Sequence, residues 1–161
     1  MNQKYVLITG ASRGIGRACA LAFARNHFHV FLNCRHSLDA LHQVAKEILD
    51  EHGSCTLLPG NAGDPDDVRK MFTIIESICP GLDVLVNNAG IMDDMSPIGD
   101  VEDERYERVM KTNVYGPMCA MRKAVDVFTK QESGGTIINI ASVGGMRSVA
   151  GAVYCASKAA L

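Results

Sequence analysis

The sequence predicts an α/β fold in which helices cover both faces of a doubly wound parallel sheet, in one domain spanning residues 1–161. Short apolar segments alternate with amphipathic segments from the first residues onward, as parallel sheets with helical crossovers require. The first apolar segment runs directly into a glycine-rich turn. The composition is 47% hydrophobic and 21% charged, which is ordinary for a globular domain of this length.

The order of the expected elements defines the topology. Apolar runs that read as strands occur at 4–9, 29–33, 54–59, 82–87 and 135–141. Amphipathic helices are expected at 14–27, 38–50, 65–79 and 101–129, and a last one begins near 152. Right-handed crossovers between such strands predict the sheet order 3-2-1-4-5.

Several functional classes are not favoured by the composition. A net charge of −2 offers no electrostatic reason to bind nucleic acid or an anionic membrane, and no apolar run is long enough to span a bilayer. The six scattered cysteines and five histidines show no spacing typical of a metal site, so reduced, mostly structural thiols and a cytoplasmic location are expected.

The turn after the first strand reads TGASRGIG, with glycines at positions 10, 14 and 16. A glycine-rich turn between a strand and a helix lets the backbone approach a pyrophosphate at the helix N-terminus. A tight turn without a ligand also uses glycine, but the position after the first strand of an alternating fold favours a nucleotide site.

Four further motifs accompany this turn: NNAG at 87–90, KTNVYG at 111–116, INIASVGG at 138–145 and a Tyr154-x-x-x-Lys158 pair. Together the five motifs resemble those of the short-chain dehydrogenase/reductase family over the whole chain. The resemblance implies a catalytic set made of Asn113, Ser142, Tyr154 and Lys158. It also implies cofactor contacts from two glycine-containing motifs, the third strand and the last helix: Gly10, Ser12, Arg13, Gly14, Ile15, Gly16, Asn88, Ala89, Gly90, Asn61, Ala62, Tyr154 and Lys158.

The chemistry of the last motif follows from its spacing. Residues four apart on a helix share a face, so the Lys158 ammonium lies beside the Tyr154 phenol and favours its phenolate. Such a phenol can deliver a proton to a carbonyl oxygen, and Ser142 can hydrogen-bond the same oxygen. Taken singly, a helical tyrosine is usually a core residue and an exposed lysine is usually solvated.

Asn113 is marked by a proline four residues later. Pro117 has no N–H to donate to the Asn113 carbonyl, so the Gly116–Pro117 pair is expected to bend the long helix and free that acceptor. A surface kink without function is the alternative. In the family that this chain resembles, the asparagine holds a water in a proton relay toward the lysine.

The residues at the end of the second strand indicate whether the cofactor is NAD(H) or NADP(H). An acidic residue there would bind a ribose 2′-hydroxyl and indicate NAD(H), but Cys34 and Arg35 occupy the position. With Arg13 in the glycine turn, two arginines and no carboxylate suit a 2′-phosphate, which predicts NADP(H) rather than NAD(H). Two solvated surface arginines are the alternative interpretation.

The expected function is hydride transfer between NADP(H) and a small ketone or secondary alcohol, as in relatives such as 3-oxoacyl-(acyl carrier protein) reductases. Loops 91–100 and 144–153 are expected to border the substrate. Members of the family continue further and are homo-oligomeric, so this chain is expected to be C-terminally incomplete and to lack their last strands. The alternative is an NADP(H)-binding module, or an enzyme remnant, without turnover.

Overall fold

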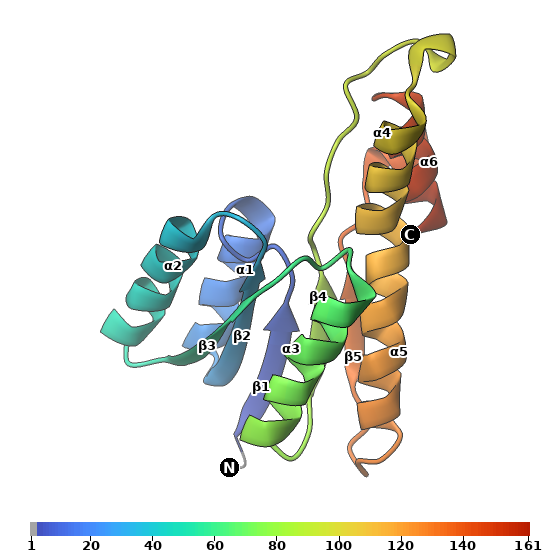
Figure 1. Ribbon diagram of the computed structural model, residues 1–161. Helices are drawn as coiled ribbons and strands as arrows, with labels where there is room; N and C mark the ends of the chain where they lie inside the picture. The colour runs from blue at the N-terminus through green and yellow to red at the C-terminus, as the bar shows by residue number, and fades with distance from the viewer. Residues whose placement is uncertain (1–2) are drawn as a thin grey trace.

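The computed structural model describes residues 3–161 and contains one five-stranded parallel sheet in the order β3-β2-β1-β4-β5. The strands are β1 (Lys4–Ile8), β2 (Phe28–Cys34), β3 (Ser54–Pro59), β4 (Val84–Asn87) and β5 (Thr136–Asn139). Figure 1 shows all five pointing the same way, with their carboxyl ends directed toward α4 and α6. The predicted fold class and strand order are therefore confirmed.

The register of the central strands explains the apolar runs seen in the sequence. Val6 pairs with Val30 of β2 and with Val84 of β4, so β1 is hydrogen-bonded on both edges. Val6, Leu7 and Ile8 are almost fully buried, because helices cover both faces of the sheet. A strand in that position needs apolar residues at consecutive positions rather than at alternate ones.

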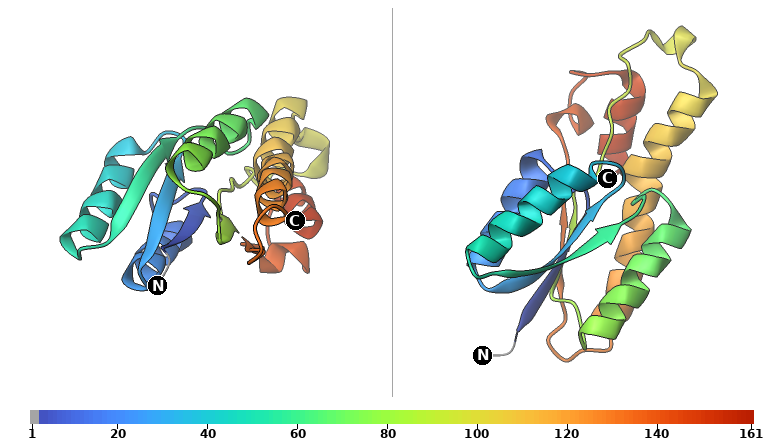
Figure 2. Two further views of the ribbon diagram at one scale, coloured as in Figure 1. Left: turned by 90° about the horizontal axis from the view of Figure 1, so that it is seen from below. Right: turned by 60° about the vertical axis from the view of Figure 1, so that its left-hand side comes forward.

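Two helical layers enclose two separate cores. Helices α1 (Gly14–Arg25) and α2 (Leu38–Asp50) pack on one face, and α3 (Pro65–Ile78) and α5 (Gly116–Phe128) pack on the other. The view from below in Figure 2 separates these layers. Successive strand residues point alternately into the two cores, so Ile8 joins the α1–α2 side and Leu7 joins the α3–α5 side.

The start of α3 follows its sequence signal. The Asp64 carboxylate accepts hydrogen bonds from the amides of Asp66 (2.9 Å) and Asp67 (3.3 Å), and Pro65 occupies the first helical turn. Both features satisfy or remove amide donors that lack an intrahelical partner. The predicted cap is therefore confirmed.

The single long helix expected over 101–129 is divided into three segments. Helix α4 (Asp103–Met110) passes into a π-helical segment (Lys111–Tyr115), and α5 follows from Gly116. The Gly116 amide donates to the Lys111 carbonyl five residues back, which gives the wider π-helical turn. The expected disturbance at Gly116–Pro117 is thus present, but as a π-helical turn that contains Asn113 instead of a simple bend.

The remaining elements lie beyond the carboxyl end of the sheet. They are the short 3₁₀ turns Ile98–Asp100 and Val143–Gly145 and the last helix, α6 (Ala152–Ala160). Figures 1 and 2 show α4 and α6 beside each other above β4 and β5. Within residues 3–161, no helix combines the length and apolar character needed to cross a membrane.

Candidate active site

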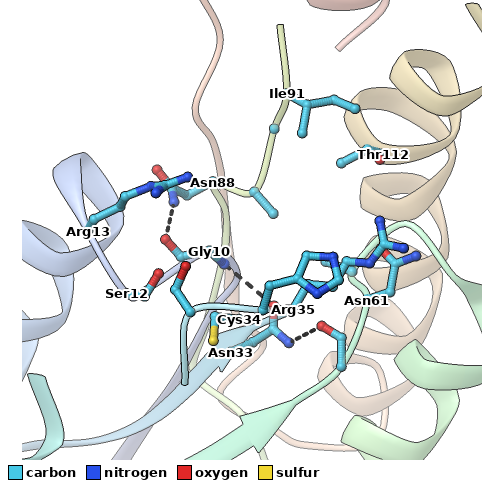
Figure 3. Close-up of a pocket in the computed structure, with 16 residues that line it drawn as sticks. Gly10, Ser12, Arg13, Asn33, Cys34, Arg35, Asn61, Asn88, Ile91 and Thr112 are labelled. Atoms are coloured by element: carbon cyan, nitrogen blue, oxygen red, sulfur yellow. Dashed lines mark hydrogen bonds between the residues drawn. The ribbon is translucent and has the colours of Figure 1, made fainter. Parts of the chain in front are cut away.

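A pocket of about 370 Å³ opens at the carboxyl ends of β1, β2 and β4. Its walls come from the last residues of β2, from the loops that follow these strands and β3, and from one residue of the π-helical segment, as Figure 3 shows. The lining residues are Gly10, Ser12, Arg13, Asn33, Cys34, Arg35, His36, Ser37, Gly60, Asn61, Ala62, Asn88, Ala89, Gly90, Ile91 and Thr112.

The glycine turn is shaped by close backbone contacts. Gly10 has φ = 65°, and a methyl group on it would lie 2.9 Å from the Ala89 Cα. A methyl group on Gly16 would collide with the Gly10 carbonyl and the Asn88 side chain. Only glycine fits at these positions, since the turn must pass between α1 and the loop after β4.

The loop after β4 is fastened to the glycine turn by side chains of both segments. The Asn88 Nδ2 donates to the carbonyls of Thr9 (2.9 Å) and Gly10 (3.0 Å). The Thr9 Oγ1 accepts from the amides of Asn88 (3.0 Å) and Ala89 (3.1 Å). Asn87 instead links two strands, because its Nδ2 donates to the Asn139 Oδ1 at 2.9 Å. Of the two asparagines of NNAG, Asn88 therefore binds the glycine turn and Asn87 binds the neighbouring strand β5.

Asn33 is a pocket residue that the motifs did not reveal. Its Nδ2 donates to the carbonyls of Leu58 (2.8 Å) and Gly60 (3.0 Å), so it joins β2 to the loop after β3. The sequence feature that could have indicated this role is a polar residue near the carboxyl end of an otherwise apolar strand. Cys34, His36, Ser37, Gly60, Ile91 and Thr112 were also not predicted as contacts, and Thr112 reaches the pocket only through the π-helical segment.

The two arginines lie on different sides of the pocket. In Figure 3 Arg35 extends toward Asn61, whereas Arg13 lies near Asn88. Among the described lining residues there is no carboxylate, so the pocket is electropositive. The nearby Asp67 carboxylate accepts the Asn61 amide at 2.9 Å, and this bond, with smaller contributions from Lys70 and Arg35, lowers the pKa of Asp67.

The Asn61 side chain bonds within its own loop. Its Oδ1 accepts the Gly63 amide at 3.0 Å and so closes the turn that leads into α3. The side chain therefore shapes its own loop while lining the pocket.

Asn113 is completely buried and uses both ends of its amide. Its Oδ1 accepts from the Ile91 amide (2.8 Å), and its Nδ2 donates to the Ile91 carbonyl (2.9 Å) and to the Ser157 Oγ (2.9 Å). Asn113 therefore connects the π-helical segment to the loop after β4 and to helix α6.

Lys158 is only 7% exposed, and its Nζ donates to the Ile140 carbonyl at 2.8 Å. Burial lowers the pKa of the Lys158 ammonium, because the charged form loses hydration. A methyl group on Gly90 would lie 3.4 Å from the Asn113 Oδ1 and 3.5 Å from the Lys158 Nζ. Asn113 and Lys158 thus meet beside a glycine that also lines the pocket.

Ser142 and Tyr154 meet in the same way beside Gly144. A methyl group on Gly144 would lie 3.3 Å from the Ser142 Oγ and 3.3 Å from the Tyr154 Cε1. The Ser142 Oγ accepts the Gly144 amide at 3.0 Å, which orients the hydroxyl oxygen within the short turn Val143–Gly145. Side chains from three segments of the chain, at 113, at 142 and at 154–158, are thus gathered in two pairs, each around one glycine.

Some predicted cofactor residues do not line this pocket. Gly14, Ile15 and Gly16 lie at the start of α1, and Tyr154 and Lys158 lie on α6. The lining set does include nine predicted residues: Gly10, Ser12, Arg13, Arg35, Asn61, Ala62, Asn88, Ala89 and Gly90. The pocket therefore contains the predicted residues of the glycine turn and of the loops after β2, β3 and β4, and its lining does not reach α6.

Comparisons with known proteins agree with this arrangement. The short chain dehydrogenase family, represented by its sequence model, matches residues 4–161. The chain therefore belongs to the short-chain dehydrogenase/reductase family of oxidoreductases, whose fold binds a nicotinamide dinucleotide.

Individual relatives are similar over almost the whole chain. Galactitol 2-dehydrogenase of Agrobacterium fabrum is 36% identical, with 100% of this chain and 61% of that protein covered. A 3-oxoacyl-(acyl-carrier-protein) reductase of Staphylococcus aureus is also 36% identical, with 97% and 63% covered. A short-chain dehydrogenase/reductase crystal structure from Mycobacterium marinum has a TM-score of 0.90 at 38% identity, with 98% and 64% covered. The chain thus spans less than two thirds of the length of each.

Proposed function

We propose that the protein containing this chain is an NADP(H)-dependent oxidoreductase that interconverts a ketone and a secondary alcohol. The family match supports oxidoreduction with a nicotinamide cofactor. Two relatives are named for chemistry at a carbonyl or an alcohol carbon. Residues 1–161 would form the NAD(P)-binding domain, and a small-molecule substrate and a cytoplasmic location belong to the same proposal.

The described residues fit the adenosine end of a dinucleotide. The turn at Gly10 brings backbone close to the pocket, and α1 begins beside it at an N-cap residue, Arg13, that makes no capping side-chain bond. The amides of that first turn are suited to a phosphate group. Arg13 and Arg35, without a lining carboxylate, favour a 2′-phosphate on the ribose.

When bound, the nicotinamide supplies or accepts the hydride. Tyr154 would donate a proton to the carbonyl oxygen during reduction and remove it during oxidation. The buried Lys158 ammonium would favour the phenolate and replace the lost proton. Ser142, oriented by the Gly144 amide, would donate a hydrogen bond to the substrate oxygen and help stabilise developing charge there.

One observation carries this proposal: Asn113 and Lys158 flank Gly90, while Ser142 and Tyr154 flank Gly144. Gly90 also belongs to the proposed cofactor pocket. The pair at Gly90 is therefore next to the proposed cofactor pocket, and the pair at Gly144 includes the phenol of Tyr154 on α6. A set of unrelated core residues would have no reason to converge on two glycines, one of which lines the pocket.

The test compares Tyr154→Phe with Tyr106→Phe, which removes the hydroxyl of a half-exposed tyrosine on α4. NADPH binding is followed by fluorescence, and turnover is followed with a panel of ketones. Tyr154→Phe is expected to abolish turnover and leave NADPH binding within about twofold, because the ring is kept and only the proton is lost. Substantial ketone reduction by Tyr154→Phe would disprove the proposed acid.

A second candidate is a binding protein without turnover. The observation that favours it is the position of the pocket, whose lining residues include neither Tyr154 nor Lys158. Tight NADPH binding without reduction of any ketone, by both the unmodified chain and a form extended at its C-terminus with the segment of a relative, would support this candidate instead.

A further inference from the structure

Asp93 contacts the helix that bears Tyr154. After β4 the chain rises alongside α4 and α6, as Figure 1 shows, and Asp93 lies in this segment. Its Oδ2 accepts a hydrogen bond from the Tyr154 amide at 2.9 Å. Tyr154 is the third residue of α6, so this amide has no carbonyl partner inside the helix. A carboxylate 61 residues away in sequence therefore caps the helix.

The residue that would normally supply such a cap cannot do so. Gly151 occupies the N-cap position of α6 and has no side chain. A methyl group there would overlap the Asp93 carboxylate, so the absence of a side chain makes room for Asp93. The structure thus replaces a local cap with one from another segment.

The second carboxylate oxygen lies against the start of the helix. The Asp93 Oδ1 is buried and has no hydrogen-bond partner among the described residues. It packs against Gly151 at the positive end of the α6 dipole. A negative charge is favoured at a helix N-terminus, which offsets part of the cost of burying this oxygen.

We propose that Asp93 is a positioning residue for the proton donor. It acts through the Tyr154 backbone and fixes the first turn of α6, so that the phenol is held at its place beside Gly144. This inference rests on the proposed role of Tyr154.

A second set of hydrogen bonds also links segment 91–93 to α6. Asn113 holds both the amide and the carbonyl of Ile91, two residues before Asp93, and also the Ser157 hydroxyl on α6. The Ser157 Oγ in turn donates to the Tyr154 carbonyl at 2.8 Å. Both backbone polar groups of Tyr154 are therefore bonded to a side chain, and these bonds link segment 91–93 to the backbone of the residue that bears the phenol.

The neighbouring residue provides a matched control. Asp94 is exposed, and its Oδ2 forms an ion pair with Arg105 at 3.1 Å. Asp94→Ala therefore removes the same charge from the same segment without removing the bond to α6. Asp93→Asn is the conservative variant, because the amide oxygen can still accept the Tyr154 N–H.

The experiment uses the 161-residue chain and two readouts by nuclear magnetic resonance. Amide hydrogen exchange is measured at Tyr154 and at Leu7 in the central strand. The ring signal of Tyr154 is followed in protein with labelled tyrosine and is assigned by its loss in Tyr154→Phe. A purely structural role would change exchange throughout the domain, whereas a positioning role changes α6 alone.

We expect Asp93→Ala to accelerate exchange at Tyr154 by about fivefold, the usual effect of losing a helix cap, and to shift the ring signal. Asp93→Asn should restore most of the protection and the signal, and Asp94→Ala should change neither. Unchanged exchange and ring signal in Asp93→Ala, or equal acceleration at Leu7, would overturn the inference. So would failure of Asp93→Asn to rescue.

Turnover separates this inference from the proposed function. With NADPH and a ketone, Asp93→Ala is expected to lower kcat and leave KM for NADPH unchanged, since Asp93 does not line the pocket and Ile91 keeps its bonds to Asn113. Activity retained by Tyr154→Phe would refute the proposed function, whereas the exchange and ring signals of Asp93→Ala would still decide whether Asp93 positions the helix.

Discussion

The Asn113 side chain forms a two-point clamp on the backbone of Ile91, accepting from its amide at 2.8 Å and donating to its carbonyl at 2.9 Å. The two residues belong to different elements, one to the π-helical segment and one to the loop after β4. Because Asn113 also donates to Ser157 on α6, a single buried side chain connects three elements of the candidate site.

Asn113→Ala is expected to lower the free energy of unfolding by about 2–3 kcal/mol, because it leaves polar groups of Ile91 and Ser157 without their partner. Urea unfolding measures this loss. Asn26→Ala is the control, since Asn26 makes an exposed bond to Ala22 at the end of α1 and should cost less than about 1 kcal/mol. If both variants lost the same free energy of unfolding, the Asn113 side chain would not hold the Ile91 backbone as the structure shows.

The sheet and the helix boundaries were largely predictable from the sequence. In a fold with alternating helices, an apolar run of four to six residues has few possible structures other than a buried strand. The start of a helix is marked by local residues such as Asp64 and Pro65. Helix α2 (Leu38–Asp50) begins and ends where its pattern predicts. These features depend on neighbours along the chain.

The contacts that organise the site were not predictable in the same way. The proline at 117 indicated a disturbed helix, but the sequence did not indicate that Gly116, where the wider turn at Lys111–Tyr115 ends, would lie against the Ala62 carbonyl. The capping of α6 by Asp93 joins residues 61 positions apart, and no local pattern marks it. Long-range contacts of this kind require the three-dimensional arrangement of the elements.

Gly116 should not tolerate a side chain. A methyl group there would collide with the Ala62 carbonyl and lie 2.8 Å from the Gly63 Cα, both backbone atoms that cannot rotate away. Gly116→Ala is therefore expected to lower the free energy of unfolding by about 1–3 kcal/mol, as overpacking usually does, and to weaken NADPH binding by displacing the loop at Asn61–Ala62. Thermal unfolding and fluorescence titration measure the two effects.

Gly99 is the matched glycine for this experiment. Within residues 3–161, nothing lies within 4 Å of a methyl group at that position, so Gly99→Ala should remain within about 0.5 kcal/mol of the unmodified chain. If Gly116→Ala were as stable as Gly99→Ala, the packing of α5 against the loop after β3 would have to be looser than the structure has it.

Arg35→Asp is expected to weaken NADPH binding by about tenfold or more and to remove or reverse the preference over NADH. A charge-assisted hydrogen bond to the 2′-phosphate would be lost, and a carboxylate would repel that phosphate while accepting a ribose hydroxyl. Affinities for both cofactors are compared by fluorescence titration. Arg122→Asp, an exposed change on α5 away from the pocket, should leave the ratio unaltered. Equal affinity of the unmodified chain for NADPH and NADH would refute the preference itself.

Lys158 is expected to make stability rise with pH in the alkaline range. Burial lowers its pKa in the folded chain, whereas the unfolded lysine keeps a value near 10.5. Between the lowered value and 10.5 the unfolded chain binds more protons, so raising the pH favours the folded state. Urea unfolding is measured for Lys158→Met and for the lysine-containing chain, both in a Tyr154→Phe background that keeps the phenol from titrating.

The difference in unfolding free energy between these two proteins isolates the ammonium. As the pH rises toward 10.5, the lysine-containing chain should become more stable relative to Lys158→Met, because the cost of burying the charge disappears when Lys158 loses its proton. Below the lowered pKa the difference should be flat, since both states then hold the proton. A difference that stays constant, or that moves against lysine as the pH rises, would mean that the Lys158 ammonium is hydrated in solution and is not buried at the Ile140 carbonyl.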